Sequence, residues 1–447
     1  SALRLTTTGN YNTALGWQAL YNNVHGDRST AIGYQALHSS TPSDGGGQNT
    51  AVGDRSGYKM TTGHSNVTMG YLSGYELTTG ERNVIIGHEA GQKADTLNYS
   101  TIIGNNAGYN VSGSTSVVYV GRNAGYHVSG SGNTFLGTSA GLGSASLTQA
   151  TQESVAIGQN SFYYNSTANF CVAIGAGALM GDSSAGATGQ GNVAIGRETL
   201  KSATTAALNV AIGYSAMYDS TEAAESVAIG GYAAGDITTG KYNTAVGYTA
   251  LRSATTSQRN TALGYAAMRD YTQASDSYNV AVGMYAMQNV TEGSSNVAIG
   301  YNALAGVASN DMDYNVAIGA QALYYNTTGD ENTALGRNAL FDNTTGNENV
   351  AIGSSAGENN TTSGRSVFVG SYSGYQSTGD KNVYIGYDSG KESRAGVENV
   401  SLGYQAGMNQ NVGNYSVLIG SEAGRNATTT SNTVAIGRQA AGGAALT

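Results

Sequence analysis

The stretch Asn296-Val297-Ala298-Ile299-Gly300 is the unit from which the rest of the chain is built. A strand-like segment of this form returns 25 times, and its closing glycine falls first at Gly16 and last at Gly437. Of the 24 intervals between these glycines, 17 are 17 residues long, two are 16, and five are 19 to 21. So short a period over the whole length predicts a solenoid whose coils bury their apolar faces by stacking on each other.

The repeat predicts an all-β fold, a parallel β-solenoid of about 25 coils with a 17-residue period. We expect one elongated domain over residues 1–447, with full repeats at about 10–441 and incomplete repeats at both ends. Ala2-Leu3 fall in the register of Ala19-Leu20, so the sequence starts in mid-coil. Because neither end offers the cap that solenoids need, we expect this sequence to be part of a longer protein.

Composition and charge exclude several classes of function. Charged residues make up 11% of the chain and the net charge is −9, so nucleic acid is a poor partner. No apolar run is long enough for a membrane span, so no membrane insertion is expected.

Cys171 is the only cysteine and is predicted to be a small core residue. The five histidines share no register and no cluster at ligand spacing, so we predict no metal, no cofactor, no catalytic residue and no enzyme.

Each position of the repeat has a restricted composition. With the closing glycine numbered zero, position −1 is Ile, Val, Leu or Met, and position −3 is Val or Thr. Side chains alternate along a strand, so these two positions share a face, and their β-branched character predicts that they fill the coil. Position −4 is Asn in 16 repeats and Ser in six, which predicts a ladder of stacked amides. The zero glycine is expected at a corner with φ > 0.

Positions −2 and +4 exchange volume between repeats. A second short strand is expected after the corner, and its position +4 is Leu, Met or Phe in twelve repeats, all with Ala at −2. Where +4 is Gly, position −2 is usually large, and Gly57 beside Ala51 and Gly357 beside Ala351 are the exceptions. Close-packed interiors keep their volume nearly constant, so these two positions should fill the same space.

With −3 and −1 directed inward, position −2 would leave a second apolar stripe exposed along the chain. We therefore predict parallel self-association around this stripe, most simply as three chains. The residues predicted at the inter-chain axis are Ala298, Leu304, Ala317, Leu323, Ala334, Leu340, Ile85, Ile102, Tyr119, Phe135, Phe368 and Tyr384. The alternative is a monomer whose inner cavity takes both sets of side chains.

Tyrosine is abundant, with 31 residues, of which 17 fall at positions +1 and +5. Amphipathic rings suit the binding of sugars and proteins, and the candidate surface-binding residues are Tyr58, Tyr75, Tyr109 and Tyr126. The alternative is that the rings cap the coil corners and pack on each other. Binding is also expected at the insertions of the five longer intervals, residues 38–48, 142–153, 181–191, 269–278 and 305–314.

The pattern Asn/Ser-Val-Ala-Ile-Gly, followed by a small residue and a polar turn, resembles the head repeat of trimeric autotransporter adhesins, the YadA-like family. Ala-Leu after the glycine and turns such as Thr327-Thr328-Gly329 are similar to repeats of phage tail-fibre-like proteins. The resemblance covers nearly all of Asn10 to Ala441, although the period is longer than that of the adhesin head. It implies a left-handed parallel β-roll, three chains around one axis and a role in attachment.

These features predict a non-enzymatic fibre shaft or adhesin body that extends from a cell or virion surface and mediates attachment. The expected partners are further copies of the chain, in a parallel homotrimer, and a host glycan or surface receptor. With a coil rise of about 4.8 Å, the repeats would span on the order of 120 Å. The alternative is an ice-binding or purely structural extracellular filament protein, although the Thr pairs of the turns form no continuous flat face.

Overall fold

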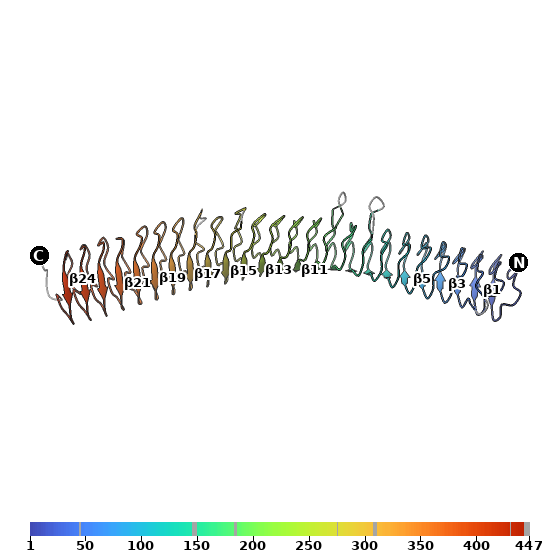
Figure 1. The fold of residues 1–447 in the computed structure, drawn as a ribbon, viewed down its shortest axis with the longest axis horizontal. Coiled ribbons are helices and arrows are strands. Elements are labelled where there is room, and N and C mark those ends of the chain that lie inside the picture. The colour runs from blue at the N-terminus through green and yellow to red at the C-terminus, as the bar shows by residue number, and fades with distance from the viewer. Residues whose placement is uncertain are drawn as a thin grey trace. The chain divides into compact units, whose positions relative to one another are not determined.

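Both parts of the chain are parallel β-solenoids (Figure 1). The computed structural model describes residues 1–43, 46–144, 150–182, 186–274, 276–306, 311–429 and 431–441. The chain divides into two units, Ser1–Glu225 and Ser226–Thr447, and in each unit every coil carries one three-residue strand. The five predicted insertions lie partly outside the described residues, as does the C-terminal end from residue 442.

The strands occupy the predicted segment, positions −3 to −1, in every coil that the structure describes. Those of the first unit are β1 (Thr13–Leu15), β2 (Thr30–Ile32), β3 (Thr50–Val52), β4 (Val67–Met69), β5 (Val84–Ile86), β6 (Thr101–Ile103), β7 (Val118–Val120), β8 (Thr134–Leu136), β9 (Val155–Ile157), β10 (Val172–Ile174), β11 (Val193–Ile195) and β12 (Val210–Ile212). Those of the second unit are β13 (Val227–Ile229), β14 (Thr244–Val246), β15 (Thr261–Leu263), β16 (Val280–Val282), β17 (Val297–Ile299), β18 (Val316–Ile318), β19 (Thr333–Leu335), β20 (Val350–Ile352), β21 (Val367–Val369), β22 (Val383–Ile385), β23 (Val400–Leu402), β24 (Val417–Ile419) and β25 (Val434–Ile436).

Within each unit, consecutive strands pair in parallel and in register, so that equal repeat positions lie side by side. In the pairing of β17 with β18, for example, Ala298 lies beside Ala317 and Ile299 beside Ile318. The intervals of 19 residues are absorbed outside the strands, because β17 and β18 keep this register across one of them. The predicted parallel β-solenoid with a period of about 17 residues is thereby confirmed.

The zero glycine closes each strand at a corner that a side chain does not fit. Gly300 has φ = 135°, and a Cβ atom there would lie 2.7 Å from the carbonyl oxygen of Gly319 in the next coil. Gly283 has φ = 131°, and its Cβ atom would lie 2.6 Å from the Gly300 carbonyl oxygen. The predicted positive φ is confirmed, and the close approach of neighbouring coils is a second reason for glycine.

The segment after the corner is a turn, and the expected second strand is not formed in the described coils. Positions +2 and +4 have left-handed backbones, with φ = 53° at both Asn302 and Leu304. The Asn302 N–H donates to the Met284 carbonyl at 3.1 Å, and the Leu304 N–H donates to the Ala322 carbonyl at 2.9 Å. Alternate N–H groups therefore reach opposite neighbouring coils, and the backbone is hydrogen-bonded without a strand.

Each coil directs position −2 into its core and positions −3 and −1 outward. Ala298 is fully buried, whereas Ile299 is 38% exposed, and the same order recurs from β2 to β25. The prediction that −3 and −1 fill the coil is therefore wrong. Period-two alternation fixes which residues share a face, and it leaves open which face lies inside.

The predicted inter-chain axis is also wrong, because its residues line the interior of a single chain. The side chains of that set are 0 or 1% exposed: Ala298, Leu304, Ala317, Leu323, Ala334, Leu340, Ile85, Ile102, Tyr119, Phe135, Phe368 and Tyr384. They are buried without any second chain and offer no surface to one. Positions −2 and +4 share the inner space of the coil, whereas −3 and −1 lie outside it, so the alternative of a cavity that takes both sets is not formed either.

Positions −2 and +4 fill the same space, as their volumes predict. A Cβ atom added to Gly390 would lie 2.5 Å from the ring of Tyr384, and one added to Gly125 would lie 2.6 Å from the ring of Tyr119. A large residue at −2 therefore leaves room only for glycine at +4 in the same coil. The exchange of volume takes place within one chain.

Position +7 is a third core position, and together with neighbouring coils it explains the two exceptions. Met60 is fully buried at +7, and its Cε would lie 3.4 Å from a Cβ atom added to Gly57. A Cβ atom added to Gly357 would lie 2.6 Å from Phe368 and 3.0 Å from Leu340, which belong to the coils on either side. The core is therefore shared between successive coils.

Asparagine at −4 forms the predicted ladder. The Asn296 backbone N–H donates to Asn279 Oδ1 at 2.9 Å, and Asn296 Nδ2 donates to the same oxygen at 3.2 Å and to the Met312 carbonyl at 2.7 Å. In the next coil, the Asn315 N–H donates to Asn296 Oδ1 at 2.9 Å. Asn296 is fully buried, so its amide supplies partners to backbone groups that water does not reach.

Replacing Asn296 tests the ladder. Asn296→Ala leaves the Asn315 N–H and the Met312 carbonyl without this partner, and we expect the free energy of unfolding to fall by about 1–3 kcal/mol. Asn296→Ser should cost less, because Ser226 at the same position accepts the Asn243 N–H at 3.1 Å. Urea denaturation of the three proteins measures the difference, and equal losses for both variants would contradict the ladder.

A paired exchange tests the shared core space. Tyr384→Ala should leave a cavity and cost about 3–5 kcal/mol, and Gly390→Leu should clash with the Tyr384 ring. The double variant recreates the pair formed by Ala334 and Leu340, and we expect it to recover most of the loss. The backbone permits this, since Leu340 has φ = 51° and Gly390 has φ = 60°. Losses that simply add in urea denaturation would show that the two positions are independent.

Candidate functional site

The outward face of the strands carries a row of apolar side chains at position −1 and a mixed row of Val and Thr at position −3 in each unit. In the second unit it includes Ile299 and Leu335, of which Leu335 is 44% exposed. In-register pairing places equivalent side chains one strand spacing apart, about 4.8 Å. The stripe at positions −3 and −1, named the outer stripe below, is a regular apolar surface of the kind that marks an interface.

The four candidate tyrosines lie at position +5 and form two stacks in the first unit. The ring centroids of Tyr58 and Tyr75 are 5.1 Å apart with planes at 6°, and those of Tyr109 and Tyr126 are 4.8 Å apart with planes at 6°. His38 extends the first stack at 5.0 Å from Tyr58, and burial lowers the pKa of its imidazole. The rings pack on each other as the alternative supposed, and their role in binding stays a prediction.

The tyrosines at position +1 are the more exposed rings. Their exposed fractions lie between 41 and 49%, and the residues are Tyr34, Tyr71, Tyr214, Tyr248, Tyr265, Tyr301, Tyr387 and Tyr404. Neighbouring members also stack, as in Tyr248 and Tyr265, whose centroids are 5.6 Å apart with planes at 18°. Each ring directly follows a zero glycine, so the row presents flat amphipathic groups to solvent.

A third aromatic row, at position −5, was not predicted from the sequence. Its exposed members are Tyr11, Tyr99, Phe170, Tyr242, Tyr278, Tyr314 and Tyr415. Arginines of neighbouring coils cover some rings, with the Arg82 Cζ 5.3 Å from the Tyr99 centroid and the Arg259 Cζ 5.2 Å from that of Tyr242. Aromatic, charged and small polar residues occur at this position in no regular order. The row of rings is therefore recognised only when all the repeats are aligned.

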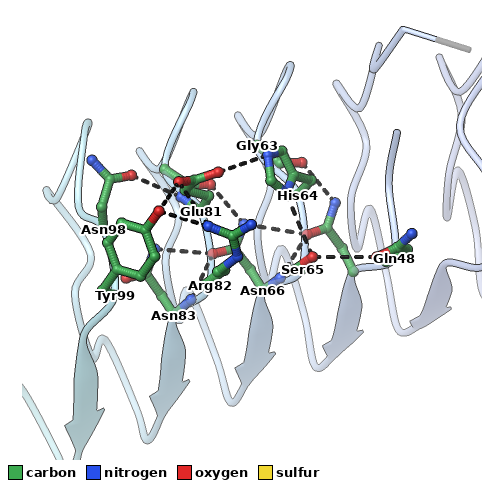
Figure 2. Close-up of polar contacts among 12 residues, drawn as sticks. Gln48, Gly63, His64, Ser65, Asn66, Glu81, Arg82, Asn83, Asn98 and Tyr99 are labelled. Carbon is green, nitrogen blue, oxygen red and sulfur yellow. Dashed lines mark hydrogen bonds and ion pairs between the residues drawn. The ribbon is translucent and has the colours of Figure 1, made fainter. Parts of the chain in front are cut away.

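A polar network joins positions −6 and −5 of neighbouring coils in the first unit (Figure 2). The Tyr99 hydroxyl donates to Glu81 Oε1 at 2.6 Å, and His64 Nε2 lies 2.8 Å from Glu81 Oε2. Arg82 donates to the Tyr99 hydroxyl at 2.6 Å. The hydrogen bond from Tyr99 lowers the pKa of the Glu81 carboxyl group, which therefore stays ionised and holds the three coils together.

This network contains a serine, a histidine and a carboxylate, the residue types of a hydrolase triad, but its geometry does not activate the serine. Ser65 Oγ donates to Gln48 Oε1 at 3.3 Å and stands 3.4 Å from His64 Nδ1. Both distances exceed the hydrogen bond of about 2.6–3.2 Å that joins an activated nucleophile to its base, and the hydroxyl also contacts an amide oxygen of the preceding coil. The arrangement favours cross-coil bonding, and the expectation that the chain is not an enzyme stays a prediction.

Cys171 is buried, as predicted for a core residue, and burial raises the pKa of its thiol. Among the described residues no group of three or more His, Cys, Asp or Glu side chains is placed to hold a metal ion. The same part of the chain contains no helix that is long and apolar enough to cross a membrane.

Two comparisons, with family models and with curated proteins, give no match. No family model matches this sequence, and no curated protein is significantly similar to it. The resemblance to adhesin and tail-fibre repeats therefore stays a prediction, and the function has to be argued from the surfaces of the solenoid.

Removing two rings from a +5 stack separates packing from binding. We expect Tyr58→Ala with Tyr75→Ala to lower the free energy of unfolding by at least about 1 kcal/mol, because a stacked aromatic pair is lost. Tyr301→Ala, at the exposed +1 row, is the control and should cost less. Thermal unfolding and binding to cells or glycans are measured together. Binding lost with stability unchanged would contradict the packing role.

Proposed function

We propose that the protein is a non-enzymatic fibre shaft or adhesin body that acts outside the cell and mediates attachment to a host cell, glycan or other surface. Its chains associate in parallel, as a homotrimer. The observation that carries this proposal is the outer stripe, which leaves apolar side chains exposed on one face of each unit. The solenoid supplies length and rigidity, and its surface rows supply contacts.

The outer stripe is best covered by another copy of the chain. Ile299, Ile318 and Leu335 lie side by side on successive strands, and a matching partner has to present apolar side chains at the same spacing. A parallel copy of this chain does so without any adjustment of register. Three copies around one axis form a closed arrangement in which every chain presents the same stripe. The proposed inter-chain axis is therefore lined by positions −3 and −1, and not by positions −2 and +4 as the sequence predicted.

The exposed aromatic rows support the attachment role. The +1 and −5 rings remain outside the core, and neither row belongs to the strand positions proposed for assembly. Rings of Tyr offer large contact areas at a low cost in conformational entropy. An assembled fibre would present several copies of each row, so that weak contacts with a surface add up.

The alternative of an ice-binding or purely structural filament shares the solenoid but is less well supported by the outward face. Ice binding requires a regular row of hydroxyl-bearing side chains. Position −3 is Thr at Thr244 and Thr261 but Val at Val227, Val280 and Val297. The row of hydroxyls is therefore interrupted, whereas position −1 is apolar in every strand, which favours association with other chains.

Charges placed on the outer stripe test the assembly. Ile299→Lys with Leu335→Lys should convert a trimer to a monomer, because two ammonium groups would be buried at the proposed axis. The fold should persist, since both side chains point away from the core. Light scattering gives the native mass and circular dichroism the fold, with Thr362→Lys on an exposed turn as the control. A monomeric unmodified protein would overturn the proposal.

A further inference from the structure

A surface cavity of ≈340 Å3, named the notch below, opens in the first unit where one coil carries small residues at positions +1 and +2 and Met180 at +5. Ala176 and Gly177, at positions +1 and +2 of that coil, are among its lining residues. The coils on either side contribute Gln159 and Asn160 on one wall and Arg197 on the other. At position +1 the row of rings is absent from Asn105 to Arg197, and Ala176 is the smallest residue of that stretch.

The notch has the width of one coil. Coils are about 4.8 Å apart, so walls that belong to the coils before and after Ala176 leave a slot of about that thickness. Elsewhere at position +1 a ring occupies the equivalent place, as where Tyr248 and Tyr265 stack at 5.6 Å. A six-membered sugar ring is a slab of comparable thickness, so one such ring is the size of ligand that the slot suggests.

One wall of the notch carries two cations. Lys201 Nζ lies 3.0 Å from the Tyr218 hydroxyl and 3.3 Å from Glu198 Oε1. The Arg197 side chain is 64% exposed. Its Nη2 lies 3.9 Å from Glu198 Oε1, an ion pair beyond hydrogen-bond distance, and its Cζ lies 5.9 Å from the Tyr214 ring centroid. Because Glu198 is engaged by Lys201, the planar guanidinium of Arg197 is the group suited to a carboxylate of a ligand.

The other wall carries two amides. Among the described residues, the side chains of Gln159 and Asn160 make no hydrogen bond to the protein. Each amide offers donors on nitrogen and an acceptor oxygen, which is the combination that recognises the hydroxyl groups of a sugar. The notch therefore combines a carboxylate-binding wall with a hydroxyl-binding wall.

We propose that the notch binds a carboxylated sugar ring, of the uronic or sialic acid type, within a surface glycan. The carboxylate pairs with Arg197, and ring hydroxyls bond to Gln159 and Asn160. This inference rests on the proposed attachment function and names the class of ligand. The net charge of −9 opposes densely sulfated or phosphorylated polymers, whereas a single carboxylate meets Arg197 and Lys201, one of whose two charges is balanced by Glu198 in the same lining.

A second depression, of ≈240 Å3 in the second unit, has a different chemistry. Gly364 and Arg365 are among its lining residues, but Arg365 donates to Glu348 Oε1 through both Nε and Nη2 at 3.2 Å. Lys381 likewise donates to Glu398 at 3.1 Å. Its cations are already hydrogen-bonded to carboxylates of the chain, so it serves as an internal control.

Residues that other coils carry at the same positions fill the notch without a new backbone conformation. Ala176→Tyr installs the ring of the +1 row, and Gly177→Gln installs the residue found at Gln321. Gly177 has φ = 67° and Gln321 has φ = 60°, and a Cβ atom at Gly177 meets only Glu198 Cγ, at 3.6 Å. Ala320→Tyr makes the same +1 change in the second unit and is the matched control.

The test measures binding of the full chain to immobilised saccharides that contain uronic or sialic acid, each paired with its carboxyl methyl ester. The unmodified protein should bind the saccharides with a free carboxylate and not their methyl esters. The filled variant, Ala176→Tyr with Gly177→Gln, should bind at least about tenfold more weakly, because its new side chains occupy the slot. Arg197→Ser should weaken binding by roughly ten- to hundredfold through loss of a charge-assisted contact. Ala320→Tyr and Arg365→Ser should leave binding unchanged, and thermal unfolding verifies each fold.

Several results would overturn the notch as a binding site. One is equal binding of the unmodified protein to the acids and to their esters, and another is no binding to any acidic saccharide. A third is undiminished binding by the filled variant. The native mass reports on assembly independently of these outcomes. A protein that is monomeric yet selects acidic saccharides would refute the fibre and support the notch, whereas a trimer without this selectivity would do the reverse.

Discussion

The close approach of successive zero glycines is the constraint on which the other contacts depend. A Cβ atom at Gly300 would lie 2.7 Å from the Gly319 carbonyl oxygen, so a side chain there would force the coils apart. At the present spacing, Asn296 reaches both Asn279 and Asn315, and the Tyr58 ring reaches the next ring of its stack. A row of residues without side chains thus sets the distance at which all the rows with side chains interact.

The period, the strand, the corner and the asparagine ladder were all predictable, because each depends on residue identity at one repeat position. The inward direction of Ala298 was not, since alternation alone does not say which face of a strand is inside. The left-handed backbone of Leu304 was unforeseen for another reason. Leucine disfavours φ = 53°, and here the burial of its side chain and the cross-coil hydrogen bond of its N–H outweigh that preference.

The surface was less predictable than the core. The row that contains Tyr58 and Tyr75 was predictable because tyrosine recurs at position +5. The row at −5 was not, because rings and charged residues are mixed at that position. The notch depends on two small residues, Ala176 and Gly177, in a register where neighbouring coils carry larger ones. A search for recurring residues does not detect such an interruption, and only the geometry of adjacent coils gives it walls.

The exchange of volume between −2 and +4 bears on how a repeat chain of this kind gains or loses coils during evolution. The two positions lie on opposite sides of the zero glycine, as Tyr384 and Gly390 lie around Gly386. Recombination at the glycine would join the front of one repeat to the back of another and bring two large residues, or two small ones, into one coil. A junction in the polar turn between coils, such as Thr327-Thr328-Gly329, keeps each pair intact, so whole coils are gained or lost there with little cost to packing.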